Sequence, residues 1–177
     1  MPSPVLILPG IGNSDPQHWQ SLWEQANPNF ERVQQNDWDH PDCDEWAARL
    51  ETAIQRTKSN DTVIVAHSLA CLVVARWAAT QHTPIKAALL VAVPDPSGPI
   101  FPEEASGFSL ISKQKFYFRS IVVVSTDDPY STFEYTAGLA QAWGSDLVNI
   151  GNRSHINASS GIGDWLEGYK LLTTLRE

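Results

Sequence analysis

The sequence predicts an α/β fold, a three-layer α/β/α sandwich with about six mostly parallel strands. Three observations lead to this class. Segments typical of strands and of helices alternate from one end of the chain to the other. The strand segments are short and continuously apolar, which is typical of strands buried on both faces. Several of these runs end at proline, at glycine or in a polar stretch, which marks the start of a connection.

The first half of the chain supplies the first two strands and helices. Residues 5–8 form an aliphatic run that a Pro-Gly pair stops, so they predict a buried strand. An Asp-Pro pair at residues 15–16 predicts a capped helix that runs to about residue 26. Residues 30–35 predict a modest strand. Asp42 or Asp44 is expected to cap a helix that extends to about residue 57, with apolar residues at helical spacing.

The second half repeats the alternation. Valine-rich or aliphatic runs predict further strands at 62–66, 87–93, 120–125 and 146–150. Helices are expected at 69–80, at 133–143 and from Ser159 or Asp164 to about residue 175. Residues 94–108 are rich in proline and glycine and predict a loop that acts as a small lid. Residues 1–177 are therefore expected to form one domain.

Composition excludes some classes of partner. The 177 residues carry 12 basic and 20 acidic side chains, a formal net charge of −8, which disfavours binding to nucleic acid or to an anionic membrane. No apolar run approaches the ~20 residues of a membrane span. The first residues lack the features of a secretory signal, and two cysteines do not indicate a disulfide framework. We therefore expect a cytoplasmic protein; its oligomeric state is not predicted.

The stretch 63–74 carries the main chemical signal. A buried strand leads into Ser68, and an apolar helix follows it directly, which is the arrangement of a nucleophile elbow. Ala66 and Ala70 stand where the usual motif has glycine, and both are small enough for a crowded turn. Ser68 is therefore a candidate nucleophile that needs a base and an orienting acid.

The carboxyl ends of the predicted strands bring a base and an acid to the same edge of the sheet. Of five histidines, His155 follows the last strand on that edge, whereas His67 adjoins the serine and should point away from it. Asp127 or Asp128 follows the preceding strand, which gives the chain order serine, acid, histidine. The backbone N–H groups of Leu69 and Ile11 are the expected oxyanion donors, with Gly12 as the alternative to Ile11.

Other residues on this edge are candidates for the substrate cleft. We expect Gly12, His18, Trp38 and His67 to line it, with residues 36–42 as a rim loop. That loop contains Asp and His but no metal-ligand spacing of a known type, so neither a metal nor another cofactor is predicted. Cys71 lies on the apolar helix and is expected in the core.

Two motifs carry a family resemblance. They are Leu-Pro-Gly-Ile-Gly-Asn-Ser-Asp-Pro-Gln-His-Trp at 8–19 and Asp-Asp-Pro-Tyr at 127–130. Shorter matches lie at 23–24, at 37–38 with Pro41, and at 65–69, 125–126, 142–144 and 151–157. With them the chain resembles the small serine hydrolases of the YdeN and retinoblastoma-binding-protein-nine type. The resemblance implies a minimal α/β-hydrolase fold, esterase-like activity and a Ser-Asp-His triad whose acid is Asp128. Family members commonly have glycine where this chain has Ala70.

Two functional hypotheses follow. The first is a serine hydrolase that cleaves a small-molecule ester of carboxylesterase type through a triad and an acyl-enzyme. The small lid also predicts a preference for short acyl chains. The alternative is a protein-binding or regulatory module that keeps the fold and has little physiological catalysis.

Overall fold

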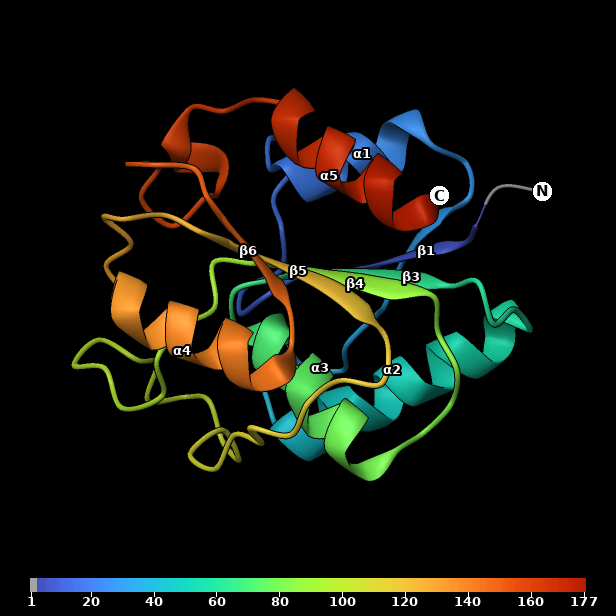
Figure 1. Cartoon of the computed structure of the whole chain (residues 1–177), viewed down its shortest axis with the longest axis horizontal. Coiled ribbons are helices and arrows are strands. Elements are labelled where there is room, and N and C mark those ends of the chain that lie inside the picture. Colours follow the sequence, from blue (N-terminus) through green and yellow to red (C-terminus); the bar gives the residue numbers. More distant parts are fainter. Residues whose placement is uncertain (1–2) are drawn as a thin grey trace.

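The computed structural model describes residues 3–177, and a parallel six-stranded sheet forms its middle layer (Figure 1). The strand order is β2-β1-β3-β4-β5-β6, and every neighbouring pair is parallel. The strands are β1 (Val5–Leu8), β2 (Phe30–Arg32), β3 (Val63–His67), β4 (Ala87–Val91), β5 (Arg119–Val124) and β6 (Asp146–Asn149). All strands therefore end at the same edge of the sheet, as expected.

Five α-helices cover the two faces of the sheet. They are α1 (Trp19–Ala26), α2 (Cys43–Thr57), α3 (Leu69–Thr80), α4 (Phe133–Trp143) and α5 (Leu166–Arg176). Helices α1 and α5 lie on one face, and α2, α3 and α4 lie on the other (Figure 1). The three-layer α/β/α sandwich predicted from the sequence is confirmed.

The core explains why the strand segments are continuously apolar. Alternate side chains of each central strand enter two separate buried clusters, one on each face. In β1, for example, Leu6 and Leu8 pack with α2 and α3, whereas Val5 and Ile7 pack with the aromatic residues of α1. Both faces of the strand must therefore be apolar.

Three expected boundaries were wrong for local reasons. Helix α1 begins at Trp19 and not near residue 15, because Asp15 accepts the N–H of Gln17 in a turn and His18 is the N-cap. Strand β2 stops at Arg32, since its partner β1 ends at Leu8, directly before a proline. Strand β4 stops at Val91, because the next residue has left-handed backbone with φ 57°.

The C-terminal helix also starts later than expected. Ser159 belongs to a short 3-10 helix, η1 (Ala158–Ser160), which Asn157 caps, and Asp164 lies in the turn that follows. Helix α5 begins only after Trp165, which has left-handed backbone. Helices α3 and α4 keep the expected bounds, and Asp42 is the N-cap of α2.

The predicted lid is a loop that is attached at several points. Residues 94–108 contain no helix or strand, and the N–H of Asp95 donates to the carbonyl of Tyr130. At the other end, Ser106 exchanges backbone hydrogen bonds with Pro41 and Cys43. We call residues 94–108 the lid segment.

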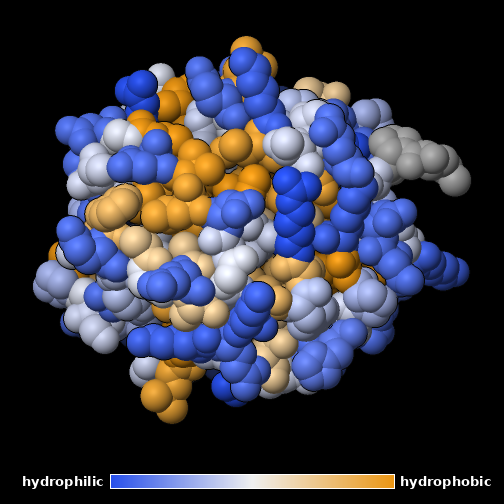
Figure 2. All heavy atoms as spheres, viewed as in Figure 1, coloured by the Kyte–Doolittle hydropathy of each residue, from blue (hydrophilic) through white to orange (hydrophobic). Residues whose placement is uncertain are grey.

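The face shown in Figure 2 is mostly polar, with apolar side chains gathered between β6 and α5. Leu147 of β6 and Leu166 of α5 are among the exposed large apolar side chains. Among the described residues, no helix combines the length and the apolar character needed to cross a bilayer.

Candidate active site

Ser68 lies at a sharp turn between β3 and α3. Its backbone has φ 56° and ψ −127°, a region that residues other than glycine rarely adopt, and its N–H donates to the carbonyl of Val91. The turn keeps this shape with Ala70 buried in the core beside it. The predicted nucleophile elbow thus has its expected conformation.

Gly10 explains how the loop after β1 can approach this turn. A Cβ atom at Gly10 would lie 3.0 Å from the Cβ of Ser68 and 3.2 Å from the carbonyl oxygen of His67. Only a residue without a side chain allows so close an approach. The loop that contains Ile11 therefore lies directly against the elbow.

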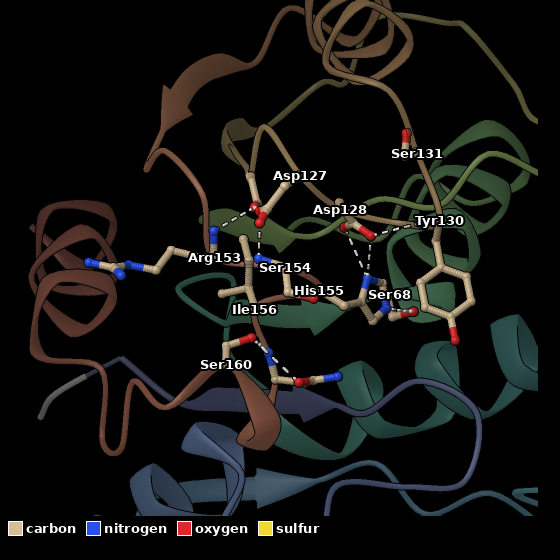
Figure 3. Close-up of polar contacts among 12 residues, drawn as sticks. Ser68, Asp127, Asp128, Tyr130, Ser131, Arg153, Ser154, His155, Ile156 and Ser160 are labelled. Carbon is tan, nitrogen blue, oxygen red and sulfur yellow. Dashed lines mark hydrogen bonds and ion pairs between the residues drawn. The ribbon is translucent and has the colours of Figure 1, made fainter.

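Three side chains from three strand ends form a hydrogen-bonded chain (Figure 3). The Oγ of Ser68 lies 2.7 Å from Nε2 of His155. The Nδ1 of His155 lies 2.9 Å from both carboxylate oxygens of Asp128. A hydroxyl, an imidazole and a carboxylate in this order can activate a serine for nucleophilic attack.

The surroundings of His155 fix the orientation of its ring. The ring of Tyr130 lies 4.4 Å from it and the ring of His67 lies 5.0 Å from it, measured between centroids. His67 donates from Nε2 to the backbone carbonyl of His155 at 2.9 Å. His67 therefore supports the loop of His155 and does not reach Ser68, as the sequence analysis expected.

The structure separates the two adjacent aspartates. Asp128 turns inward, its side chain is 3% exposed, and one of its oxygens also accepts the N–H of Tyr130 at 2.9 Å. Asp127 turns toward the backbone of the loop that precedes His155 (Figure 3). Only Asp128 contacts the imidazole, so the geometry favours it as the orienting acid.

A cleft of about 290 Å³ opens at Ser68. It is lined on one side by the loop after β1, on another by the lid segment, and on a third by the residues that follow His155. Lining residues outside the hydrogen-bonded chain are Gly10, Ile11, Asn13, Asp15, His18, His67, Leu69, Pro94, Pro102, Tyr130, Asn157, Ala158 and Ser159. Lysine and arginine are absent from this lining among residues 3–177.

Two of the four predicted cleft residues lie elsewhere. Trp38 packs against Trp46, with ring centroids 5.5 Å apart, and does not line the cleft. Gly12 lines a neighbouring polar recess instead. The expected rim loop 36–42 was also wrong, since none of its residues lines the cleft. His18 and His67 do line the cleft.

The backbone N–H groups around Ser68 distinguish the two candidates for the second oxyanion donor. The N–H of Gly12 already donates to the carbonyl of Trp38 at 2.8 Å. Within the part of the chain that the structure describes, the N–H groups of Ile11 and Leu69 have no hydrogen-bond acceptor, and both residues line the cleft. Ile11 is therefore the better-placed candidate beside Leu69.

Burial keeps the two additional histidines neutral. Burial lowers the pKa of His18 to about 4 and that of His67 well below its usual value. The sulfhydryl of Cys71 is buried as expected, and burial raises its pKa. Of the three imidazoles, those of His18, His67 and His155, only that of His155 lies within hydrogen-bond distance of a carboxylate of residues 3–177. Over residues 3–177, no three His, Cys, Asp or Glu side chains converge as a metal site would require.

Sequence reasoning missed several residues of the cleft. Tyr130 covers His155, while Asn157 and Ser159 extend the wall beyond it. Their closeness in sequence to the candidate triad could have indicated them. Tyr130 lies two positions after Asp128, and Asn157 and Ser159 lie two and four positions after His155. Pro94 and Pro102 had no comparable signal, because a lid contributes to the cleft only through its folded path.

Comparisons with known proteins identify a family and similar folds. A family model described as serine hydrolase matches residues 5–174. A structure of a YdeN-like hydrolase from Pectobacterium atrosepticum is similar with a TM-score of 0.88 and 28% identity, covering 99% of this chain and 91% of that one. The ydeN gene product of B. subtilis is similar with a TM-score of 0.77 and 22% identity, over 98% of each chain. A search of curated proteins found no match.

A structure described as a thermophilic esterase extends the similarity of the fold. This protein, from Thermogutta terrifontis, gives a TM-score of 0.69 at 14% identity, covering 99% of this chain and 91% of that one. At such low identity the similarity concerns the fold alone.

Proposed function

The chain belongs to the serine hydrolase family and has a minimal α/β-hydrolase fold, and on that premise we propose that it hydrolyses small acyl esters with Ser68 as the nucleophile. The observation that carries the proposal is the buried chain of hydrogen bonds from Ser68 through His155 to Asp128, at 2.7 and 2.9 Å. An isolated serine hydroxyl is a poor nucleophile at neutral pH, and this arrangement removes that obstacle.

In the first half of the proposed reaction, Oγ of Ser68 attacks the acyl carbonyl while Nε2 of His155 accepts the hydroxyl proton. Asp128 keeps the proton of His155 on Nδ1 and stabilises the imidazolium that forms. The N–H groups of Leu69 and Ile11 donate to the oxyanion. The intermediate collapses when the ester C–O bond breaks, and His155 protonates the departing alkoxide. The acyl group remains on Ser68 as an ester.

In the second half, a water molecule attacks the acyl-enzyme. His155 accepts a proton from this water, and a second tetrahedral intermediate forms in the same oxyanion site. When the bond to Oγ breaks, His155 returns the proton to Ser68. The products are the alcohol and the carboxylic acid.

A substrate panel tests the proposal directly. Ester, thioester and amide substrates with the same acyl group are offered to the wild type and to Ser68→Ala, together with a fluorophosphonate probe that labels activated serines. We expect ester hydrolysis to be fastest, and Ser68→Ala to lose at least about a thousandfold in kcat, since nothing else replaces the nucleophile.

An exposed serine provides the control. Ser109→Ala changes a surface serine of the segment before β5 and should leave both hydrolysis and labelling at wild-type levels. Equal labelling of wild type and Ser68→Ala would contradict the role of Ser68. Faster cleavage of the thioester or the amide would keep the mechanism but change the substrate class.

A further inference from the structure

The loop that carries His155 has an unusual backbone. Three of its residues, Gly151, Ser154 and Ile156, have left-handed conformations with φ of 71°, 48° and 47°. Glycine adopts this region freely, but serine and especially a β-branched isoleucine do so only under constraint. One strained residue therefore lies on each side of His155, and contacts from outside the loop must hold both residues in these conformations.

On one side of His155, the carboxylate of Asp127 supplies this constraint (Figure 3). Its Oδ1 accepts the N–H of Ser154 at 2.7 Å and the hydroxyl of Ser125 at 2.8 Å. The Oγ of Ser125, which is buried, accepts the N–H of Arg153 at 2.9 Å. The hydrogen bonds from Ser125 and, to a smaller extent, from Ser154 lower the pKa of Asp127. The carboxylate of Asp127 is therefore charged at neutral pH.

On the other side, Ile156 is held by contacts that do not involve Asp127. Its carbonyl accepts the indole N–H of Trp19 at 2.8 Å, and its side chain is fully buried. The end of the loop near Ile156 is therefore fixed by the core. The end near Ser154 is exposed, and Asp127 joins it to the turn that also carries Asp128.

We propose that Asp127 is a positioning residue, which binds the backbone before His155 to the end of β5 and so sets the imidazole between Asp128 and Ser68. The inference rests on the proposed function, because it assigns Asp127 a task only if His155 is the base. Asp127 does not line the cleft, and its hydrogen-bond partners are Ser125 and Ser154, so it acts through the path of the loop. The two adjacent aspartates therefore have different tasks: Asp128 contacts the ring of His155, and Asp127 binds the backbone of the residue before it.

Two substitutions at this position separate geometry from charge. Asp127→Ala removes the acceptor, so we expect kcat to fall by about tenfold to a hundredfold, as when a catalytic group is displaced by a fraction of an ångström. KM should stay within about twofold, since Asp127 does not line the cleft. Asp127→Asn keeps an oxygen acceptor without the charge and should retain kcat within about threefold.

Glu51 offers a matched control. Like that of Asp127, its carboxylate joins separate segments: it accepts the indole N–H of Trp77 at 2.7 Å and the hydroxyl of Thr83 at 2.6 Å, but it lies outside the cleft. Glu51→Ala should lower the melting temperature and leave kcat unchanged. This variant reports what a merely structural carboxylate contributes.

The measurements are kcat and KM on one ester for all variants, with the melting temperature and the rate of fluorophosphonate labelling. Wild-type kcat in Asp127→Ala, or equal losses of kcat in Asp127→Ala and Asp127→Asn, would overturn the positioning role. A loss of kcat in the control variant as large as that in Asp127→Ala, at a similar loss of melting temperature, would overturn it too. If Ser68→Ala hydrolyses the ester normally, the proposed function has failed instead, so the two failures are distinct.

Discussion

His18 uses a ring nitrogen to cap a helix, which requires the ring to be neutral. Its Nδ1 accepts the N–H of Gln20 at 3.2 Å, and the side chain is buried. The other nitrogen, Nε2, has no hydrogen-bond partner among residues 3–177. A protonated ring would lose this cap. Burial, which disfavours the charged ring, lowers the pKa of His18 to about 4 despite the nearby carboxylate of Asp15.

This histidine should make stability depend on pH between 6.5 and 4. In that interval the unfolded chain binds a proton at residue 18 and the folded chain does not, so protons favour unfolding and stability falls as pH falls. The shift from 6.5 to about 4 corresponds to a loss of about 3 kcal/mol for His18 alone. Urea unfolding at several pH values measures it.

His18→Asn is the comparison variant for this measurement, because asparagine caps helices well and does not titrate. The fall in stability between pH 6.5 and 4 should be smaller in His18→Asn than in the wild type. It will not vanish, since burial also lowers the pKa of His67. Identical pH slopes in the two proteins would contradict the assignment.

Single residues also show what sequence could and could not predict. The alternation of strands and helices predicted a parallel sheet, in which the carboxyl ends of all strands share one edge. Ser68 and His155 were therefore expected at the same edge. The spacing left the choice between Asp127 and Asp128 open, and only the family resemblance pointed to Asp128. Neighbouring residues on a turn point apart, so the folded turn determines which carboxylate faces the imidazole. Trp38 was wrongly expected to line the cleft, because its ring packs against that of Trp46 instead.

At the level of elements, the edge strand β2 has a structural task beyond pairing. From it, Arg32 donates to the Oδ1 of Asn13 at 2.8 Å, the carbonyl of Ser14 at 3.1 Å and the Oγ of Ser21 at 2.7 Å. Its guanidinium also pairs with Glu24 at 2.7 Å. A short strand thus joins the loop after β1 to helix α1. The side chain of Arg32 is only 11% exposed, so these contacts are largely shielded from water.

Arg32→Met should therefore destabilise the protein by about 3 kcal/mol, because it leaves Glu24 and several polar groups without their partner. Arg56→Met is the matched control. Arg56 pairs with Glu31 on the surface, with side chains 62% and 55% exposed, and its loss should cost at most about 1 kcal/mol. Urea unfolding of the two variants gives both values. Equal destabilisation would mean that Arg32 contributes no more than a surface ion pair.

Elements were predictable where local signals determine them. Helices α3 and α4 have the expected bounds, since α3 starts at the elbow and a threonine cap and a glycine define the ends of α4. Helix α1 begins three residues later than expected, because Asp15 and Pro16 form a turn whose sequence is the same as that of a helix start. The end of β2 depends on the length of its neighbour β1, which no local pattern in β2 reveals.

At the scale of the whole molecule, the size of the cleft limits the acyl groups that the proposed ester hydrolysis can accept. The cleft of about 290 Å³ lies at the lower end of the range for ligand sites. The lid segment that covers it is joined to β-sheet loops and to α2 by backbone hydrogen bonds, which oppose widening. The sequence predicted this small lid, but the contacts that attach it are between segments far apart in the chain.

Short acyl chains should therefore react faster than long ones. We expect kcat/KM for a nitrophenyl acetate or butyrate to exceed that for the octanoate by about tenfold or more, because the longer chain leaves apolar surface in water. The shared leaving group keeps the chemistry constant across the series. Faster hydrolysis of the octanoate would contradict the inferred size limit.

The assembly of the hydrogen-bonded chain has a consequence for how the protein acquires activity during folding. Ser68 and His155 are 87 residues apart, and His155 follows β6, the last strand of the sheet. A chain in which β1 to β5 have paired would already hold the elbow and Asp128, but not the imidazole between them. Contacts of such long sequence separation form slowly. The Ser68 hydroxyl thus gains its hydrogen-bond partner His155 only when the last strand is in place, so an incompletely folded chain cannot activate the proposed nucleophile that it already carries.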